Sequence, residues 1–206
     1  MLPFWEREIT LTSARGESSS MAMSYLSLNE VTAALQFAAR KHRQQRRKDA
    51  ERTPYINHPI ALLNILVNEA QISDAVVLIG ALLHDTVEDT DTSLTEIAAL
   101  FGEEVAAVVD QLTDDKSLPK ATRKQLQVEH AATISDRAKL VKLADKIANV
   151  RDIAMSPPPD WSPTRQQEYC DWGKRVVDQM RGTHTILETL FDEAYTAATQ
   201  DWAQAE

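Results

Sequence analysis

A cluster of four ionisable side chains closes an apolar segment near the middle of the chain. His84 and Asp85 are adjacent, and Glu88 and Asp89 follow one helical turn later in the sequence Ala-Leu-Leu-His-Asp-Thr-Val-Glu-Asp-Thr. If these residues continue one helix, both pairs at i and i+4 project toward the same end of it. Placing four such groups beside an apolar run costs free energy unless a cation neutralises them. The pattern therefore predicts a divalent metal site.

Two further residues, each on or at the end of a separate predicted helix, complete a ligand set: His58 and Asp145. Taken alone, each has an ordinary explanation, because a histidine beside a proline often caps a helix and Asp145 could pair with Lys146 at the surface. Together with His84 and Asp85 they offer two imidazoles and two carboxylates. This set suits Mn²⁺, Fe²⁺ or Zn²⁺ better than Ca²⁺. Four protein ligands on a six-coordinate metal leave positions for water and substrate.

The bulk composition excludes several protein classes. The chain has 206 residues, of which 43% are hydrophobic and 26% charged, as in a globular domain. Its single cysteine excludes an intrachain disulfide framework and a multi-cysteine zinc site, and it favours a reducing, cytoplasmic compartment. No apolar stretch approaches the roughly 18 residues that cross a bilayer. Charged residues at positions 6–8 argue against a signal peptide, so no membrane association is expected.

The charge is unevenly distributed along the chain. The net charge is −9, yet seven of the 22 basic residues lie within positions 40–52, which we call the basic block. A nucleic-acid binder would usually be basic overall, so no nucleic-acid partner is expected. The basic block suits a small, highly charged anion, and a solvated helix face is the alternative interpretation.

The elements that must position these residues are all predicted to be helices. Residues 1–26 lack helical periodicity and are expected to form a flexible N-terminal extension, whereas residues 27–206 form a single domain. The predicted helices begin near Ser27, Ile60, Ser73, Ser93, Glu104, Lys120, Ser135, Ser162 and Thr183. Ser27 and Ser93 open capping boxes, and the proline-containing residues 53–59 form a rigid connector. Since no segment shows period-two alternation, the sequence predicts an all-α bundle of about eight or more helices.

The ordered set of motifs resembles a known family. His58, the His84-Asp85 doublet and Asp145 resemble the metal-binding pattern of HD-domain phosphohydrolases. Four segments resemble, more narrowly, the hydrolase domain of RelA/SpoT proteins in its stand-alone, Mesh-type form: Arg47-Lys48-Asp49, Thr53-Pro54-Tyr55-Ile56-Asn57-His58-Pro59, His84-Asp85-Thr86-Val87-Glu88-Asp89-Thr90 and Lys142-Leu143-Ala144-Asp145-Lys146-Ile147-Ala148-Asn149. The resemblance spans roughly residues 29–200. It implies an HD-type helical bundle that hydrolyses the 3′-diphosphate of ppGpp or pppGpp, giving GDP or GTP and pyrophosphate.

The resemblance also implies roles for individual residues. One Mn²⁺ per site is expected to be held by His58, His84, Asp85 and Asp145. Glu88 and Asp89 are expected to handle the attacking water as catalytic residues, and which of them is the general base stays open. The resemblance places pyrophosphate contacts at Lys120 and Arg165.

Four further residues are candidates for contacts with the nucleotide. Arg47 and Lys48, in the basic block, could flank the purine and contact phosphate, because a guanidinium can stack on a base. Asn149 lies four residues after Asp145 and is therefore expected on the same helix face, within reach of the ribose. Tyr169 is a second candidate for that role, with plain packing as the alternative.

Two other functions are compatible with these residues. One is a phosphatase that acts on another 2′- or 3′-phosphorylated nucleotide, such as NADPH; the other is a catalytically idle nucleotide-binding sensor. The intact Glu88-Asp89 pair counts against the sensor, because synthetase-only relatives lack it. Alarmone synthesis is not expected, since the chain ends at Glu206 without room for a synthetase domain. The sequence leaves the oligomeric state open.

Overall fold

The computed structural model describes residues 19–200, and their side chains from residue 28 onward. Within this range the chain forms ten α-helices, one π-helical segment and no strand. The elements are α1 (Ser19–Lys41), α2 (Asn57–Asn64), η2 (Ile65–Glu69), α3 (Ala75–Leu83), α4 (Thr86–Asp89), α5 (Leu94–Phe101), α6 (Glu103–Leu112), α7 (Lys120–His130), α8 (Asp136–Met155), α9 (Pro163–Asp178) and α10 (Thr185–Thr199). The prediction of an all-α bundle is confirmed. None of these helices has the length and apolarity needed to cross a bilayer.

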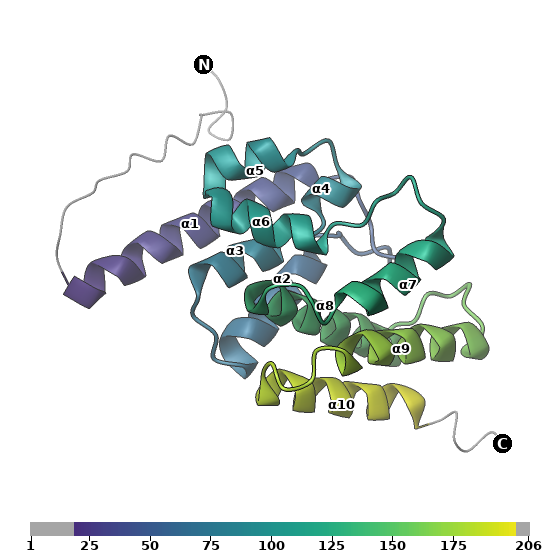
Figure 1. Ribbon diagram of the computed structural model, residues 1–206. Coiled ribbons are helices and arrows are strands. Elements are labelled where there is room, and N and C mark those ends of the chain that lie inside the picture. The colour runs from purple at the N-terminus through teal and green to yellow at the C-terminus, as the bar shows by residue number, and fades with distance from the viewer. Residues whose placement is uncertain (1–18, 201–206) are drawn as a thin grey trace.

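Helix α3 is the central element of the bundle and contacts α1, α2, α6 and α8. Every residue from Val77 to Leu83 is buried, which explains why the helix is apolar all round rather than along one stripe. Ile79 and Leu82 join a core cluster with α1, α5 and α6, whereas Val77 and Ala81 join a second cluster with α2 and α8 to α10. Figure 1 shows α4 to α6 at one end of the molecule and α9 and α10 at the other, with α8 between them.

Three helices begin after the capping serines expected from the sequence. The hydroxyls of Ser93, Ser135 and Ser162 each accept a hydrogen bond from a backbone amide three residues later. The prediction for Ser73 was wrong by one residue, because the carboxylate of Asp74 caps α3 by accepting from the amide of Val76 at 2.9 Å.

The predicted start of the first helix was also wrong. Helix α1 begins at Ser19, so it covers part of the segment expected to be a flexible extension and runs through the capping box at Ser27. Met, Ala and Leu between these two positions favour helix, and a serine preference for N-caps does not stop a helix already formed. The expectation for residues 1–18 lies outside the described residues.

The connector that carries His58 is shorter than predicted. Helix α2 begins at Asn57, three residues before the expected start at Ile60, and its continuation is π-helical over Ile65–Glu69 rather than regular up to Ala70. The preceding chain folds back on itself, because the amide of Tyr55 donates to the carbonyl oxygen of Gln45 at 3.1 Å. This turn brings the basic block against the start of α2.

The expected single helix through the His-Asp doublet is interrupted. Helix α3 ends at Leu83, His84 and Asp85 form a turn, and the four-residue helix α4 follows. The hydroxyl of the buried Thr86 donates to the Leu83 carbonyl oxygen at 2.7 Å, which satisfies a backbone acceptor at the end of α3. Glu88 therefore lies in a separate short helix, and the predicted placement of all four groups at the end of one helix is wrong.

Candidate metal centre and surrounding cavity

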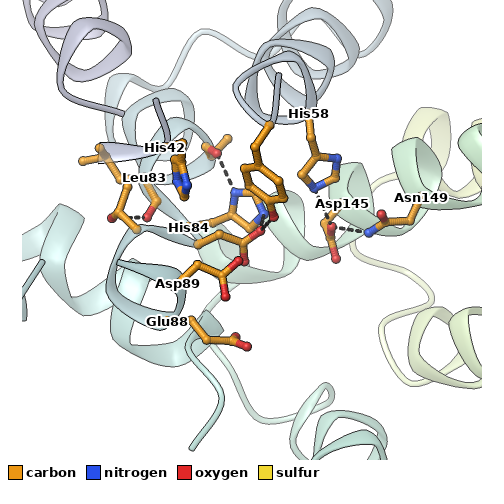
Figure 2. Close-up of polar contacts among 12 residues, drawn as sticks. His42, His58, Leu83, His84, Glu88, Asp89, Asp145 and Asn149 are labelled. Atoms are coloured by element: carbon orange, nitrogen blue, oxygen red, sulfur yellow. Dashed lines mark hydrogen bonds and ion pairs between the residues drawn. The ribbon is translucent and has the colours of Figure 1, made fainter. Parts of the chain in front are cut away.

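Three of the four predicted metal ligands come together from separate helices. His58 lies in the first turn of α2, His84 directly follows α3, and Asp145 lies in the middle of α8. One ligand atom from each of the three lies within 4.8 Å of the others, and His58 Nε2 is 3.2 Å from Asp145 Oδ1. Both imidazoles are buried. Figure 2 shows the three side chains converging on one point, with Glu88 and Asp89 close by.

The orientation of His84 suits metal binding. Its Nδ1 lies 2.8 Å from the carbonyl oxygen of Ala81. Because a carbonyl only accepts, Nδ1 carries the hydrogen, so deprotonation of the ring exposes the lone pair of Nε2. That Nε2 atom is buried and makes no hydrogen bond within the described part of the chain. A backbone contact of this kind commonly orients metal-ligating histidines, so the residue fits a divalent cation.

Asp85 lies next to this group of three rather than within it. Its Oδ2 is 2.9 Å from His84 Nε2, without the geometry of a hydrogen bond, and it accepts a hydrogen bond from the hydroxyl of Tyr55. The structure thus places Asp85, the fourth predicted ligand, beside the cluster. Its hydrogen-bond donor, Tyr55, was not predicted from the sequence.

The charges of the cluster depend strongly on one another. Burial alone would lower the pKa of His84, but the carboxylates of Asp85 and Asp145 raise it to about 9. Burial would raise the pKa of Asp145, yet Lys146 and then His58 hold it well below its ordinary value. The carboxylates are therefore ionised and favour positive charge at His84, whereas burial lowers the pKa of His58. A divalent cation would supply that charge and displace a proton from His84.

Lys146 is part of the site and not of the protein surface. Only 4% of its surface is exposed, and its Nζ lies 2.9 Å from Asp145 Oδ2 and 3.1 Å from Gln127 Oε1. The same ammonium group lies 4.3 Å from the ring centroid of Trp172. The alternative interpretation of Asp145 as half of a surface ion pair is therefore wrong, because its partner is buried.

Glu88 and Asp89 face the same cavity with different partners. Asp89 accepts a hydrogen bond from Gln45 Nε2 at 2.7 Å through Oδ2 and pairs with the ammonium group of Lys116 through Oδ1. Glu88 has longer contacts, 3.3 Å to the amide of Asp114 and 3.5 Å to Arg123 Nη1. Burial, and then the charge of Asp85, raise the pKa of the Glu88 carboxyl.

A cavity of about 490 Å³ opens over the cluster. Its lining includes ten of the twelve predicted site residues: Arg47, Lys48, His58, Asp85, Glu88, Asp89, Lys120, Asp145, Asn149 and Tyr169. His84 does not line the cavity itself but lies 2.9 Å from Asp85, which does. Arg165 is exposed and does not line the cavity; its guanidinium stacks 4.5 Å from the ring centroid of Trp161, which does.

Two of the residues predicted to contact the nucleotide, Arg47 and Asn149, are held by polar contacts. Arg47 pairs with Asp152, and its Nη2 also lies 3.3 Å from Asn149 Oδ1. Asn149 in turn donates to Asp145 Oδ1 at 2.5 Å, so it links the metal cluster to Arg47 as its helix position predicted. Tyr169 lines the cavity and also packs against Trp161, with ring centroids 5.2 Å apart, so both interpretations of this residue remain compatible with the structure.

Sequence reasoning missed several residues of the site, among them Gln45, Tyr55, Arg123, Gln127 and Trp161. Two of them stand within segments that had been singled out, Gln45 in the basic block and Tyr55 in the connector, and that position was the signal that could have found them. The remainder lie in α7 or in the loop before α9. Nothing in the local sequence indicates that those elements fold over the metal cluster.

The comparisons with known proteins agree with this geometry. The sequence model of the HD domain matches residues 34–171. The chain belongs to the HD-domain family. Among HD-domain relatives, it is 57% identical over 159 residues to human guanosine-3′,5′-bis(diphosphate) 3′-pyrophosphohydrolase MESH1, and the match covers 77% of this chain and 89% of the relative. The protein of the same name from Xenopus tropicalis is 53% identical over 165 residues, covering 80% and 92%.

A solved structure has the same fold, that of "A metazoan ortholog of SpoT hydrolyzes ppGpp and plays a role in starvation responses". The TM-score is 0.78 at 48% sequence identity, and the match covers 88% of this chain and 97% of the other. The HD-domain assignment therefore holds for sequence and for three-dimensional structure.

Proposed function

We propose that the chain is a metal-dependent 3′-pyrophosphohydrolase of ppGpp and pppGpp, which releases pyrophosphate and leaves GDP or GTP. The observation that carries this proposal is the cluster of His58, His84 and Asp145 at the base of a cavity that also presents Glu88 and Asp89. Two relatives, 53% and 57% identical to this chain over 92% and 89% of their own lengths, are named for this reaction.

Cationic side chains on the cavity wall suit a 3′-diphosphate. Arg47, Lys48 and Lys120 line the cavity, and Arg165 stacks beside it. One favourable charge pair at 4 Å is worth about 4 kcal/mol at an effective dielectric constant of 20, before desolvation. Burial, and then repulsion by the positive charges of Lys48 and Arg165, lower the pKa of Lys120. Binding of an anion relieves that repulsion.

The reaction requires an activated water and a protonated leaving group. A divalent cation held by the cluster would offset phosphate charge and lower the pKa of water. Glu88 is the better general base, because its raised pKa and long contacts leave it able to accept a proton. Asp89, with both oxygens engaged, orients the water. The bond between phosphorus and the ribose 3′-oxygen breaks, and Glu88 returns the proton to that oxygen.

We further propose Mn²⁺, one ion per site, as the resident metal. Two imidazoles with a carboxylate oxygen and no thiolate form a mixed set that suits Mn²⁺, Fe²⁺ or Zn²⁺, and the resemblance to RelA/SpoT hydrolases favours Mn²⁺ among them. Metal analysis of the protein as isolated tests this choice: we expect about one manganese per chain, and zinc or iron at that stoichiometry would contradict it.

The remaining expectations are proposals of the same kind. We place the protein in the cytoplasm, with residues 27–206 as one HD-type domain and a small guanosine nucleotide as its partner instead of nucleic acid or a membrane. The sole cysteine, Cys170, is buried and free, and the net charge of −9 disfavours polyanions.

One assay tests the proposed function against its alternatives. Protein with Mn²⁺ is incubated with ppGpp, pppGpp or NADPH, and products are separated by ion-exchange chromatography. We expect pyrophosphate from the first two, abolished by EDTA. Orthophosphate from NADPH at a comparable kcat/KM would favour the 2′-phosphatase instead. Nucleotide binding without turnover, unchanged in the double variant Glu88→Gln, Asp89→Asn, would leave only a sensor.

A further inference from the structure

A third buried histidine lies beside the metal cluster without belonging to it. His42 directly follows α1 and is only 2% exposed. It is not among the residues whose ligand atoms converge on one point. Its Nδ1 lies 2.6 Å from Gln45 Oε1, and its Nε2 is buried without a hydrogen-bond partner among the described residues. The ring therefore has one polar contact, and that contact is short.

Gln45 connects this imidazole to Asp89. Its Nε2 donates to Asp89 Oδ2 at 2.7 Å, while its Oε1 faces His42. An ionised carboxylate only accepts, so the amide nitrogen must face Asp89 and the amide oxygen must face the imidazole. His42 Nδ1 must then carry the hydrogen. The three side chains form a directed series in which His42 donates to Gln45 and Gln45 donates to Asp89.

The other contact of Asp89 is less rigid. Lys116 belongs to the loop between α6 and α7, and 49% of its side chain is exposed. Ion pairs of exposed lysines are weak and readily exchanged for water. Gln45 is instead held from behind by a buried ring. In Figure 2, His42 and Asp145 lie on opposite sides of His84, and His42 does not line the cavity.

The same imidazole also packs against the donor to Asp85. The ring centroids of His42 and Tyr55 are 4.8 Å apart, and the Tyr55 hydroxyl donates to Asp85. One buried side chain thus supports the orientation of two carboxylates of the site, Asp89 through a hydrogen-bonded amide and Asp85 through packing.

We propose that His42 is a positioning residue, which through Gln45 fixes the Asp89 carboxylate in the orientation required for water placement. This inference rests on the proposed hydrolysis, because water placement by Asp89 is part of it. His42 itself does not line the cavity and supplies none of the converging ligand atoms; it contacts Gln45 and Tyr55, which do line the cavity. Its effect must therefore appear in turnover and not in nucleotide binding.

Three variants test the series of hydrogen bonds from His42 through Gln45 to Asp89, which we call the relay. His42→Leu removes the donor, Gln45→Leu removes the link, and His42→Asn keeps an N–H close to the position of Nδ1. We expect the two leucine variants to lower kcat for ppGpp about 10- to 100-fold with KM changed less than about 3-fold, since small misplacements of reacting groups cost rates of this order. His42→Asn should recover most of the loss. Gln44→Leu, an exposed neighbour, is the matched control and should leave kcat unchanged.

A measurement on the metal-free protein tests the relay without any turnover. Long-range ¹H–¹⁵N spectra of the imidazoles should show His42 in the tautomer protonated at Nδ1, and Gln45→Leu should perturb that signal. Observation of the Nε2 tautomer, or equal kcat in Gln45→Leu and wild type, would overturn the relay. A wild-type protein that leaves ppGpp intact would overturn the proposed function, and the tautomer would then decide the hydrogen-bond series on its own.

Discussion

The carboxylates of Glu88 and Asp89 are adjacent in sequence and are held in opposite ways. Asp89 is bonded at both oxygens, by Gln45 at 2.7 Å and by Lys116. Glu88 has only longer contacts, of 3.3 Å and 3.5 Å, and burial raises its pKa. A fixed carboxylate suits the orientation of water, whereas a loosely held one with a raised pKa suits acceptance of a proton.

The first prediction separates these two roles. Glu88→Gln should lower kcat about 10²- to 10⁴-fold, the range of general-base catalysis. Because the base acts only when deprotonated and its pKa is raised above 4.5, wild-type kcat/KM should fall as the pH drops through that raised value. The pH profile of kcat/KM for each single variant checks this. The acid limb should disappear in Glu88→Gln and persist in Asp89→Asn; the reverse pattern would exchange the roles.

The second prediction concerns metal binding and stability. A cation that binds only the folded chain stabilises it by about 2.7 kcal/mol at a hundred times its Kd. For a chain of this length, Mn²⁺ should therefore raise Tm by roughly 5 to 10 °C, as followed by calorimetry with and without EDTA. Asp145→Asn should lose most of the shift, because Asp145 is one of the converging ligands. Glu104→Gln, on an exposed side chain of α6, should keep it.

The third prediction concerns an ion pair remote from the cavity. Arg151 donates two hydrogen bonds of 2.8 Å to Glu69, and these lower the pKa of Glu69 below 4.5. A lowered pKa in the folded state stabilises the protein above the unfolded value, and the contribution is lost as the pH falls through the folded value. Glu69→Gln should cost about 1 kcal/mol at pH 7 in urea unfolding.

Repeating the urea unfolding at lower pH tests whether the charge of Glu69 is the cause. The difference in unfolding free energy between wild type and Glu69→Gln should shrink below pH 4.5, because the wild-type carboxyl then also becomes neutral. Asp136→Asn, at a side chain 91% exposed, should change stability by less than about 0.5 kcal/mol. A difference that stays constant down to acid pH would show that charge plays no part at Glu69.

The fourth prediction compares two helical glycines. A Cβ at Gly80 would lie 2.9 Å from Val108 Cγ1, whereas a Cβ at Gly173 would lie 3.7 Å from Val150 Cγ2. Gly80→Ala should therefore destabilise the protein by about 1–3 kcal/mol through overpacking of α3 against α6. Gly173→Ala should be neutral or stabilise by up to about 1 kcal/mol.

A second change tests the cause at Gly80. In the background of Gly80→Ala, Val108→Ala removes the clashing methyl groups and should cost less than the same change in the wild type. Thermal unfolding of the four members of this cycle gives the coupling between the two sites. Additive effects would mean that the clash with Val108 is not the source of the loss.

Much of the site was predictable because the residue types, helix caps and helical spacings that define it can be read from short stretches of sequence. The ligand types at His58, His84 and Asp145 and the caps at Ser93, Ser135 and Ser162 each depend on a few neighbouring residues. Helical spacing also placed Asn149 beside Asp145, and the structure has that contact.

What the sequence did not predict depends on tertiary packing. The break after Leu83 requires a hydroxyl turned inward at Thr86, and such a rotamer has no signature in the pattern of apolar residues. A surface ion pair is one interpretation of Asp145 from the sequence, because lysines are rarely buried, yet Gln127 in α7 and Trp172 in α9 enclose its partner Lys146. The link from His42 to Asp89 joins the segment after α1 to helix α4, and only the folded chain brings these two together.

The turn between α3 and α4 limits how this motif can be transferred. On an uninterrupted helix, successive side chains diverge by about 100°, so neighbouring histidine and aspartate residues would point to different sides. Here Asp85 Oδ2 lies 2.9 Å from His84 Nε2 at the turn that joins α3 to α4, where Asp85 has φ −103° and ψ 0°. A designer who transfers the doublet to another helical scaffold should therefore include this turn and Thr86, whose hydroxyl donates to the Leu83 carbonyl oxygen. These residues keep the two ligand atoms of His84 and Asp85 close together.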